Sequence, residues 1–382
     1  MTNAILDGDT HVNEPPDLWQ ARVPKAIADR APRMVDLPGD RMAWWFDGGK
    51  TASITPLCNA VAEAPVNWRL FSKGYDERFR SGAWEPAARL ADMDLDMTET
   101  HVLFPTYALS GTRGFSKDRD VAVACVRAYN DWLSDFCAHD PKRLIGVGML
   151  PLTGVDDAIA EAKRVRGLPG MRAVLATGWP NGSRHPRPAE DDRFWSVLED
   201  LDLPVQIHVG FGTGGEVEAA GEAADRGPDV IAGISLAMLN EERQAISMIP
   251  ILGHLILDGV LERHPRLRVG LAEVGAGWIP FFLEQTNDNF KRHRFWTKCN
   301  LSMLPSEYWS RQCFATFQID TYAVRNRELV GTHTMIWSSD YPHTGSDWPS
   351  SRATIAAQMT GVPESDQRLI LGDNARRLYG LT

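Results

Sequence analysis

Four side chains of the types that bind metal ions stand at the ends of short apolar segments. Asp9 and His11 close the first segment, His208 closes one near the middle of the chain, and Asp340 follows one near its end. Residues two apart in a strand face the same side, so Asp9 and His11 point together. Two carboxylates and two imidazoles form a mixed ligand set that suits a divalent ion. We therefore expect one metal ion here, with Zn(II) as the first candidate and Mn(II) and Fe(II) as alternatives.

Each of these residues also has an ordinary structural explanation when it is taken alone. His208 could be a hydrogen-bonded polar residue, and Asp9 could cap a loop. Their combination at three strand ends favours the metal site. Since a metal ion lowers the pKa of a bound water, Asp340 could also act as a base towards that water.

Glu273 and His343 are further candidates for acid–base chemistry beside Asp340. Glu273 ends another apolar segment and could act as a general acid or base, or hold a ligand in place. The alternative is a buried carboxylate bonded to a neighbouring group. His343 could bind substrate, orient Asp340 or be exposed. Glu14, close to the first pair, could be an ordinary polar group of a loop.

Eight apolar segments would have to position these side chains. They have little alternation, which is typical of strands buried on both faces of a parallel sheet. Helical patterns separate most of them, and this rhythm predicts a single (β/α)₈ barrel domain over residues 1–382. An open doubly wound sheet is the alternative, but no GxGxxG follows the first segment. The segments are Ala4–Asp9, Thr100–Pro105, Leu144–Leu150, Ala173–Thr177, Pro204–Val209, Leu267–Glu273, Phe314–Ile319 and Met335–Ser339.

Six stretches have the apolar spacing of helices. The longest, Ile231–Arg263, is long enough to be two helices, which we expect to part near Pro250. The others are Asp118–His139, Asp156–Arg166, Asp192–Leu201, Trp278–Arg292 and Glu364–Tyr379.

An insertion over residues 35–89 interrupts the rhythm after the first segment. Trp44–Phe46, an Asp-Gly-Gly turn and Thr51–Thr55 predict a β-hairpin within it. Loops that follow barrel strands lie at the catalytic end, so we expect the insertion to cover the mouth of the active site. A surface decoration is the alternative. Trp44, Trp45 and Trp68 could face a substrate ring there or only pack.

The composition excludes several classes of protein. Hydrophobic residues make up 43% and charged residues 24% of the 382 residues, as in globular proteins. The net charge of −10 and the lack of a basic stripe argue against a nucleic-acid partner. The five cysteines form no CxxC pair, so we expect free thiols and a cytoplasmic protein. The sequence shows no signal peptide and no apolar run long enough for a membrane span.

Several motifs together resemble the amidohydrolase-related family. They are the first-segment DGDTHVNE, the IHVG around His208, the SSDYPH around Asp340 and the closing LILGDNARRLYGL. More narrowly, they and GVLERHPRLRVGLAEVGAGWIP resemble the branch of aminocarboxymuconate semialdehyde decarboxylase and the resorcylate-type decarboxylases. The resemblance spans essentially the whole chain outside residues 35–89, and the order and spacing of the motifs are specific.

The resemblance implies a (β/α)₈ barrel with one divalent metal ion, commonly zinc or manganese. By position, it places the first-strand ligands on Asp9 and His11, the fifth-strand ligand on His208 and the eighth-strand ligand on Asp340. An acidic residue in place of the first histidine has precedent among aromatic acid decarboxylases.

The sequence departs from these decarboxylases at the end of the sixth strand. They usually place a histidine there, which is implicated in protonating or positioning the substrate, and some carry an acid three residues later. Here the two positions hold Glu273 and Ala276. The departure leaves the metal ligands intact but opens the choice of reaction, because a fold does not fix a function.

Three hypotheses for the function follow. The first is a metal-dependent hydrolase that acts through activated water on a small cyclic or aromatic carboxylated, amide or ester substrate. The second is a non-oxidative decarboxylase of an aromatic or muconate-type acid, in which Asp340 or Glu273 protonates the ring carbon. The third is a non-catalytic barrel that serves as a scaffold. By family analogy, we also expect a homo-oligomer such as a dimer.

Overall fold

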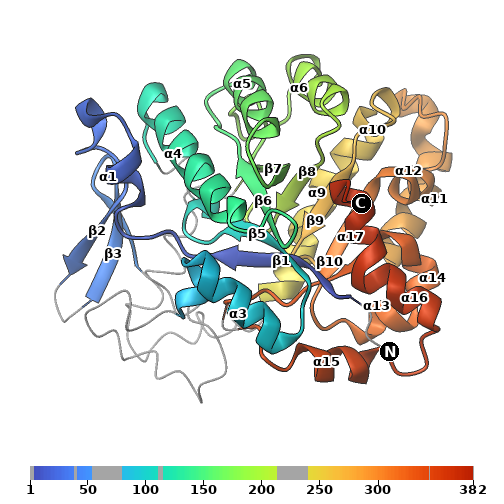
Figure 1. Cartoon of the computed structure of the whole chain (residues 1–382). Coiled ribbons are helices and arrows are strands. Elements are labelled where there is room, and N and C mark those ends of the chain that lie inside the picture. Colours follow the sequence, from blue (N-terminus) through green and yellow to red (C-terminus); the bar gives the residue numbers. More distant parts are fainter. Residues whose placement is uncertain are drawn as a thin grey trace, which may run out of the picture.

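Eight parallel strands form the central sheet of the computed structural model, which describes residues 4–37, 41–53, 80–110, 115–212, 240–343 and 345–381. Their order in the sheet is β1-β5-β6-β7-β8-β9-β10-β11. Figure 1 labels β1 and β5 to β10 of these strands. Every neighbouring pair is parallel. The strands are β1 (Leu6–Val12), β5 (Thr100–Pro105), β6 (Leu144–Met149), β7 (Met171–Ala176), β8 (Val205–His208), β9 (Val269–Ala272), β10 (Cys313–Phe317) and β11 (Met335–Trp337).

The first and last strands of this order, β1 and β11, come together and turn the sheet into a barrel. The backbone N–H of Asp340 donates to the carbonyl of Asp9 at 3.1 Å. The N–H of His11 donates to the carbonyl of Tyr341 at 2.6 Å. These bonds link β1 to the chain just after β11. The predicted (β/α)₈ barrel is therefore confirmed.

The strands are apolar because both of their faces are buried. Every residue of β1, β5, β6 and β8 is buried, and so is every residue of β9, β10 and β11. Such strands read as continuous hydrophobic runs. For this reason each of the eight predicted segments overlaps an observed strand.

Helices surround the barrel in Figure 1. All six predicted helical stretches contain helix. The helices of the described residues are α1 (Leu18–Arg22), α3 (Pro86–Asp96), α4 (Arg119–Ala138), α5 (Val155–Arg166), α6 (Pro188–Asp200), α9 (Asn240–Leu257), α10 (Val260–Arg263), α11 (Ile279–Thr297), α12 (Pro305–Gln312), α13 (Thr321–Arg325), α14 (Arg327–Val330), α15 (Ser351–Gln358), α16 (Glu364–Arg368) and α17 (Asn374–Tyr379), with single turns η1 (Lys25–Ile27), η3 (Ser81–Ala83), η4 (Ala108–Ser110), η5 (Thr332–Thr334) and η6 (Leu369–Asp373).

The prediction that a helix breaks near Pro250 is wrong. Helix α9 continues through Pro250 to Leu257. The break comes at Gly259, whose φ of 76° lies in the left-handed region that ends helices. Residues 231–239 of the predicted stretch lie outside the described residues.

The predicted hairpin after the first strand is confirmed. Strands β3 (Arg41–Phe46) and β4 (Lys50–Ser53) pair antiparallel, with Phe46 opposite Lys50. Gly48 and Gly49 in the turn have φ of 93° and 84°, which glycine adopts without strain. A third strand, β2 (Arg33–Leu37), pairs with β3 and was not predicted.

An aromatic contact packs this small sheet against the barrel helices. Trp44 is fully buried, 5.0 Å from Trp19 of α1 and 5.7 Å from Tyr107 between ring centroids. Trp44 therefore packs rather than facing an open mouth. Residues 38–40 and 54–79, which include Trp68, lie outside the described residues. That the insertion covers the mouth stays a prediction.

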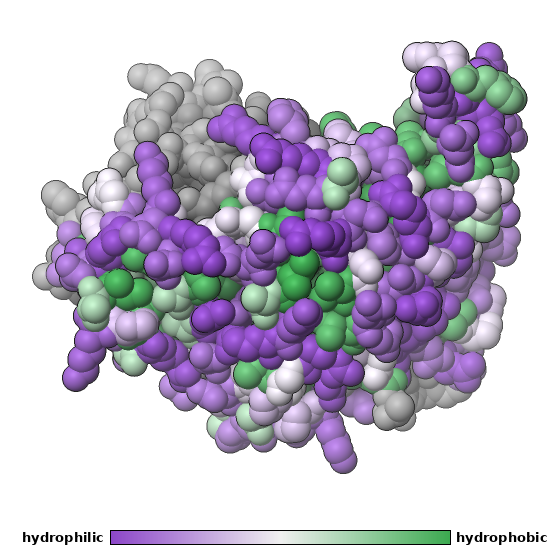
Figure 2. Space-filling model, turned by 90° about the horizontal axis from the view of Figure 1, so that it is seen from above, coloured by the Kyte–Doolittle hydropathy of each residue, from purple (hydrophilic) through white to green (hydrophobic). Residues whose placement is uncertain are grey.

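The surface in Figure 2 is mostly hydrophilic, with hydrophobic side chains in small separate groups. No helix in the described part of the chain is both long and apolar enough to span a bilayer. The cysteines at 125, 137, 299 and 313 are free thiols, as expected, while the fifth lies outside the described residues.

Candidate metal centre

The barrel brings the four predicted ligand residues to one point. Asp9 and His11 lie on β1, His208 ends β8, and Asp340 lies three residues after β11. The Nε2 atom of His11 is 3.3 Å from Nε2 of His208, 3.3 Å from Oδ1 of Asp340 and 3.6 Å from Oδ1 of Asp9. His208 Nε2 is 3.7 Å from the same Asp9 oxygen. All four residues are buried.

Backbone carbonyls orient the two imidazoles. Nδ1 of His11 lies 2.7 Å from the carbonyl oxygen of Pro105, and Nδ1 of His208 lies 3.3 Å from that of Val209. A carbonyl only accepts hydrogen bonds, so in each ring Nδ1 carries the hydrogen and donates it. Both Nε2 atoms are left to face the shared space, which is the arrangement of metal-binding histidines.

The donor atoms in this space fit a cation. Asp9 Oδ1 is buried and accepts no hydrogen bond from the described residues. Buried polar atoms in native proteins normally have a partner. Sets of possible ligand atoms converge here within 4.8 Å of one another, Asp9, His11 and His208 forming one of them. A divalent ion would satisfy this oxygen and both Nε2 atoms together, and it would replace the proton on His208 Nε2.

The charges around the two histidines also favour a cation. Burial, helped by His343 and His208, holds the pKa of His11 well below its usual range. Burial alone would lower the pKa of His208, but the carboxylates of Asp9, Glu273 and Asp340 outweigh it and raise that pKa to about 9. The carboxylates thus create a negative potential that a bound cation would balance.

Glu273, a candidate for acid–base chemistry, lies at the edge of this cluster. Its Oε2 is 3.5 Å from His208 Nε2, and its side chain is 24% exposed, so it is the most open carboxylate of the group. Glu273 and Asp340 both have φ of 58°, in the left-handed region that residues other than glycine rarely adopt. Such backbone strain at two acidic residues of one cluster is typical of functional sites.

His343 also joins the cluster. Its Nδ1 lies 2.9 Å from Oδ1 of Asp340, and its Nε2 lies 3.2 Å from the hydroxyl of Thr106. Its ring stacks on that of His11 with centroids 3.9 Å apart. Burial lowers the pKa of His343 to about 3, so its ring is neutral at pH 7. A neutral imidazole can therefore connect Asp340 to a hydroxyl group on its other side.

Thr316, which the sequence analysis missed, ties two of the acidic residues together. Its hydroxyl donates to Oδ2 of Asp9 at 3.2 Å and accepts from the backbone N–H of Glu273 at 2.8 Å. Thr316 lies near the end of β10, so the rule that polar residues at strand ends meet at one rim could have found it.

Two further charged groups are fully buried: Glu14, which the sequence analysis gave as an ordinary polar group of a loop, and Arg89, which it did not name. Glu14 is fully buried and accepts the backbone N–H groups of Tyr107 and Ala108, each at 2.9 Å. Burial raises its pKa to about 7 although these bonds favour the ionised form. Arg89, from the unpredicted helix α3, donates to the carbonyl of His11 and so fixes the backbone behind that imidazole.

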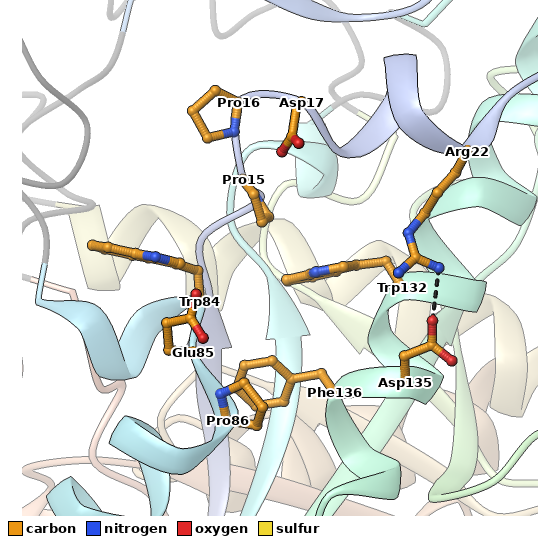
Figure 3. Close-up of a pocket in the computed structure, with 10 residues that line it drawn as sticks. All are labelled: Pro15, Pro16, Asp17, Arg22, Trp84, Glu85, Pro86, Trp132, Asp135 and Phe136. Carbon is orange, nitrogen blue, oxygen red and sulfur yellow. Dashed lines mark hydrogen bonds and ion pairs between the residues drawn. The ribbon is translucent and has the colours of Figure 1, made fainter.

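A separate groove lies on the outside of the barrel, between α1, α3 and α4 (Figure 3). Arg22 and Asp135 form an ion pair of 2.8 Å beside it. None of the predicted site residues lines this groove. Its lining residues are Pro15, Pro16, Asp17, Arg22, Trp84, Glu85, Pro86, Trp132, Asp135 and Phe136.

Two curated relatives are decarboxylases. The chain is 26% identical over 278 residues to gamma-resorcylate decarboxylase from Rhizobium radiobacter, covering 69% of this chain and 78% of that one. It is 23% identical over 346 residues to 2-amino-3-carboxymuconate-6-semialdehyde decarboxylase from Dictyostelium discoideum, covering 87% of this chain and 86% of that one.

Solved structures share the fold. An amidohydrolase from Mycobacterium avium subsp. paratuberculosis K-10 superposes with a TM-score of 0.76 at 21% identity, covering 100% of this chain and 99% of that one. A dihydroxybenzoic acid decarboxylase from Polaromonas sp. JS666, with bound manganese and the inhibitor 2-nitroresorcinol, gives a TM-score of 0.60 at 17% identity. The superposition covers 99% of this chain and 97% of that one.

A family model described as Amidohydrolase matches residues 8–381. The match includes β1 with Asp9 and His11, and it runs through His208 and Asp340 to the last helix. The chain therefore belongs to the amidohydrolase family of enzymes.

Proposed function

We propose that this protein is a metal-dependent, non-oxidative decarboxylase of a hydroxylated aromatic acid or a muconate-type acid. The curated relatives support this second hypothesis of the sequence analysis better than the hydrolase, since both are decarboxylases. The hydrolase hypothesis is supported only by the name of the family, Amidohydrolase. The scaffold hypothesis does not explain why buried carboxylates and imidazoles converge in one cluster.

One observation carries the proposal. Asp9, His11 and His208 offer ligand atoms within 4.8 Å of one another, with the two Nε2 atoms 3.3 Å apart, and Asp340 Oδ1 lies 3.3 Å from His11 Nε2. We assign Asp9, His11, His208 and Asp340 as the residues that hold one divalent ion, Mn(II) or Zn(II). With Asp340 ionised, the two carboxylates balance a charge of +2. When Asp340 carries the proton that it transfers, Asp9 and the substrate carboxylate would supply the two negative charges. The bound ion would supply positive charge for a substrate carboxylate and its neighbouring hydroxyl oxygen.

Asp340 is the residue we assign to proton transfer. In its protonated form it donates a proton to the ring carbon that carries the carboxylate, and a new C–H bond forms. The bond from that carbon to the carboxylate then breaks, its electron pair restores the ring, and carbon dioxide leaves. His343, 2.9 Å from Asp340 Oδ1, passes the proton of its Nδ1 to Asp340. Its Nε2 takes up a proton in exchange from the Thr106 hydroxyl, which regains one from water, so the ring stays neutral.

Glu273 lies on the other side of the cluster, next to His208. Its partly exposed carboxylate can accept a hydrogen bond from a substrate hydroxyl group, which orients the ring carbon towards Asp340. This role differs from that of the histidine in the related decarboxylases, so we expect a hydroxyl group on the substrate to be required here.

Carbon dioxide release tests this proposal. Purified protein loaded with Mn(II) or Zn(II) is incubated with hydroxybenzoates and muconate-type acids in D₂O. Decarboxylation predicts carbon dioxide and a product with one deuterium at the carbon that carried the carboxylate. Turnover of amides, lactones or esters without carbon dioxide would instead support the hydrolase.

Substitution of the proton donor provides the matched comparison. Asp340→Asn keeps the size of the side chain but cannot donate a carboxylic proton, so we expect carbon dioxide release to fall at least about 10³-fold. We expect Glu273→Gln, which keeps a hydrogen-bonding side chain, to lose less and mainly raise KM. Equal activity of Asp340→Asn and the wild-type protein would refute the assignment.

A further inference from the structure

A fully buried tyrosine directly follows Asp340 in the chain. The hydroxyl of Tyr341 donates to Oδ2 of Asp92 at 2.5 Å. Asp92 lies on α3 and is only 5% exposed, so both ends of this hydrogen bond are shielded from water. The bond ties the segment that carries Asp340 to a helix that precedes it by about 250 residues in the sequence.

An arginine holds the carboxylate of Asp92 from its other side. Nε of Arg80 donates to Oδ2 of Asp92 at 2.8 Å, and Nη2 donates to Oδ1 at 2.6 Å. Such a bidentate pair fixes the plane of the carboxylate. Gly82 keeps the space beside it open, because a Cβ there would lie 2.2 Å from Asp92 Oδ2 and 2.6 Å from the Tyr341 hydroxyl oxygen. The hydroxyl of Tyr341 therefore meets an acceptor whose position is fixed.

A second residue of α3 holds the ring of the same tyrosine. Arg89 lies three residues before Asp92, on the same face of the helix. Its guanidinium carbon lies 4.5 Å from the centroid of the Tyr341 ring, and its N–H groups donate to the carbonyls of Gly82 and His11. One face of α3 thus contacts both Tyr341 and the backbone of a predicted metal ligand.

Backbone hydrogen bonds connect this contact to the metal ligands. The N–H of His11 donates to the carbonyl of Tyr341 at 2.6 Å, and the N–H of Asp340 donates to the carbonyl of Asp9 at 3.1 Å. Asp340 has its φ of 58° between these two bonds. A residue stays in such a strained conformation only where its surroundings hold it there. Tyr341, as the next residue, is placed to supply that hold.

The polar chemistry of this contact favours positioning over stability alone. Apolar side chains of similar size often stabilise a fold as well as a buried ion pair does, because buried charges lose their hydration. Hydrogen bonds to charged groups are short and directional, so a buried network of them specifies one arrangement. The chain from Arg80 through Asp92 to Tyr341 is such a network, and it ends beside a strained metal ligand.

We propose that α3 clamps Tyr341 and thereby positions His11 and Asp340 for the divalent ion. Asp92 fixes the hydroxyl of the tyrosine and Arg89 fixes its ring. Without this clamp, Asp340 would leave its strained φ, and its Oδ1 would no longer lie 3.3 Å from His11 Nε2. Tyr341, Asp92 and Arg89 are positioning residues, because the groups of possible ligand atoms in the described part of the chain include none of them. The proposal rests on the metal site of the proposed function but not on the reaction.

Metal binding by Tyr341→Phe tests the clamp. Phenylalanine keeps the ring and the backbone bonds but loses the hydroxyl, so Asp340 is held less firmly. The dissociation constant for Mn(II) or Zn(II), measured on the full-length protein by competition with a chelator, should rise about tenfold. Tyr308→Phe is the matched control and should keep wild-type affinity. Tyr308 is equally buried, and its hydroxyl donates to the carboxylate of Glu262, but this bond joins α12 to α10 outside the barrel.

Co(II) in place of the native ion separates positioning from a general loss of stability. The visible absorption bands of bound Co(II) depend on the geometry of its ligands. Tyr341→Phe should shift these bands, whereas Tyr308→Phe should give the wild-type spectrum. Asp92→Ala breaks the same hydrogen bond from its other end. Tyr341→Phe combined with Asp92→Ala should therefore bind metal no more weakly than Asp92→Ala alone.

The results that would overturn the clamp are distinct from those that would overturn the metal site. If the wild-type protein binds one ion and Tyr341→Phe binds it with the same affinity and spectrum, the clamp is wrong and the metal site stands. Additive losses in the double variant would also refute the clamp, since Tyr341 and Asp92 would then act separately. A wild-type protein that binds no ion would overturn both. None of these outcomes depends on which reaction the protein catalyses.

Discussion

Thr316→Val should weaken metal binding without changing the shape of the site. The threonine hydroxyl donates to Asp9 Oδ2 at 3.2 Å and accepts from the N–H of Glu273 at 2.8 Å. Valine keeps the branched shape of the side chain but makes neither bond. Asp9 would then lose the hydrogen bond that orients its carboxylate, and the N–H of Glu273 would lose its acceptor.

The size of the effect follows from these two bonds. A hydrogen bond to a charged group contributes about 1.5–3 kcal/mol, and a factor of ten in affinity corresponds to about 1.4 kcal/mol. The metal dissociation constant should therefore rise about 10- to 100-fold, as substitutions behind metal ligands typically cause. Loss of the hydrogen bond from the N–H of Glu273 should lower the free energy of unfolding by about 1–3 kcal/mol even without metal.

Competition with a chelator of known affinity measures the dissociation constant for Mn(II) or Zn(II). Thr334→Val is the matched control, because Thr334 is equally buried and donates to the carbonyl of Gly331 at 2.8 Å, just before β11. It should lose stability but keep wild-type metal affinity. If Thr316→Val and Thr334→Val bind metal equally well, Asp9 is not a ligand held by Thr316 and the reasoning fails.

Two further predictions concern stability. Burial raises the pKa of Glu14 from 4.5 to about 7, so the folded protein binds this proton more tightly and stability is lost as pH rises from 4.5 to 7. The free energy of unfolding of Glu14→Gln relative to that of the wild-type protein, measured with urea, should therefore rise by up to roughly 3 kcal/mol between pH 4.5 and pH 8. A difference that does not change with pH would contradict this. Gly8→Ala would place a methyl group 2.3 Å from Cγ2 of Ile336, where β1 meets β11, and should cost about 1–3 kcal/mol in the same assay. In Gly253→Ala, in α9, the added methyl group meets no atom within 4 Å, so this variant should be as stable as the wild-type protein or more stable. An equal loss of stability in both variants would argue against the close contact between β1 and β11.

The barrel could be predicted from the sequence because its strands are buried on both faces. Continuous apolar segments such as Thr100–Pro105 carry that burial directly in their composition, and the observed β5 has the same bounds. Helices with weaker signals were missed. Helix α3 buries three charged residues, Arg89, Asp92 and Asp96, with Met93 as the one apolar residue in its buried set, so its sequence lacks the apolar stripe of a helix.

The convergence of the candidate site could be predicted because barrel topology alone brings strand ends to one rim. Asp9, His11 and His208 therefore needed no knowledge of side-chain packing. The roles of Thr316 and Glu14 could not be predicted, because they depend on which hydroxyl or backbone N–H faces each carboxylate. The break at Gly259 was misplaced because proline was taken as the stronger helix breaker, although the glycine adopts the left-handed conformation.

The metal content of wild-type protein and of His208→Ala tests the central claim most directly. Both proteins are expressed with Mn(II) or Zn(II), passed through a desalting column and analysed by mass spectrometry for bound metal. We expect about one divalent ion per chain in the wild-type protein and almost none in the variant, because His208 supplies one of the two facing Nε2 atoms. A folded His208→Ala protein that keeps its full metal content would contradict the account.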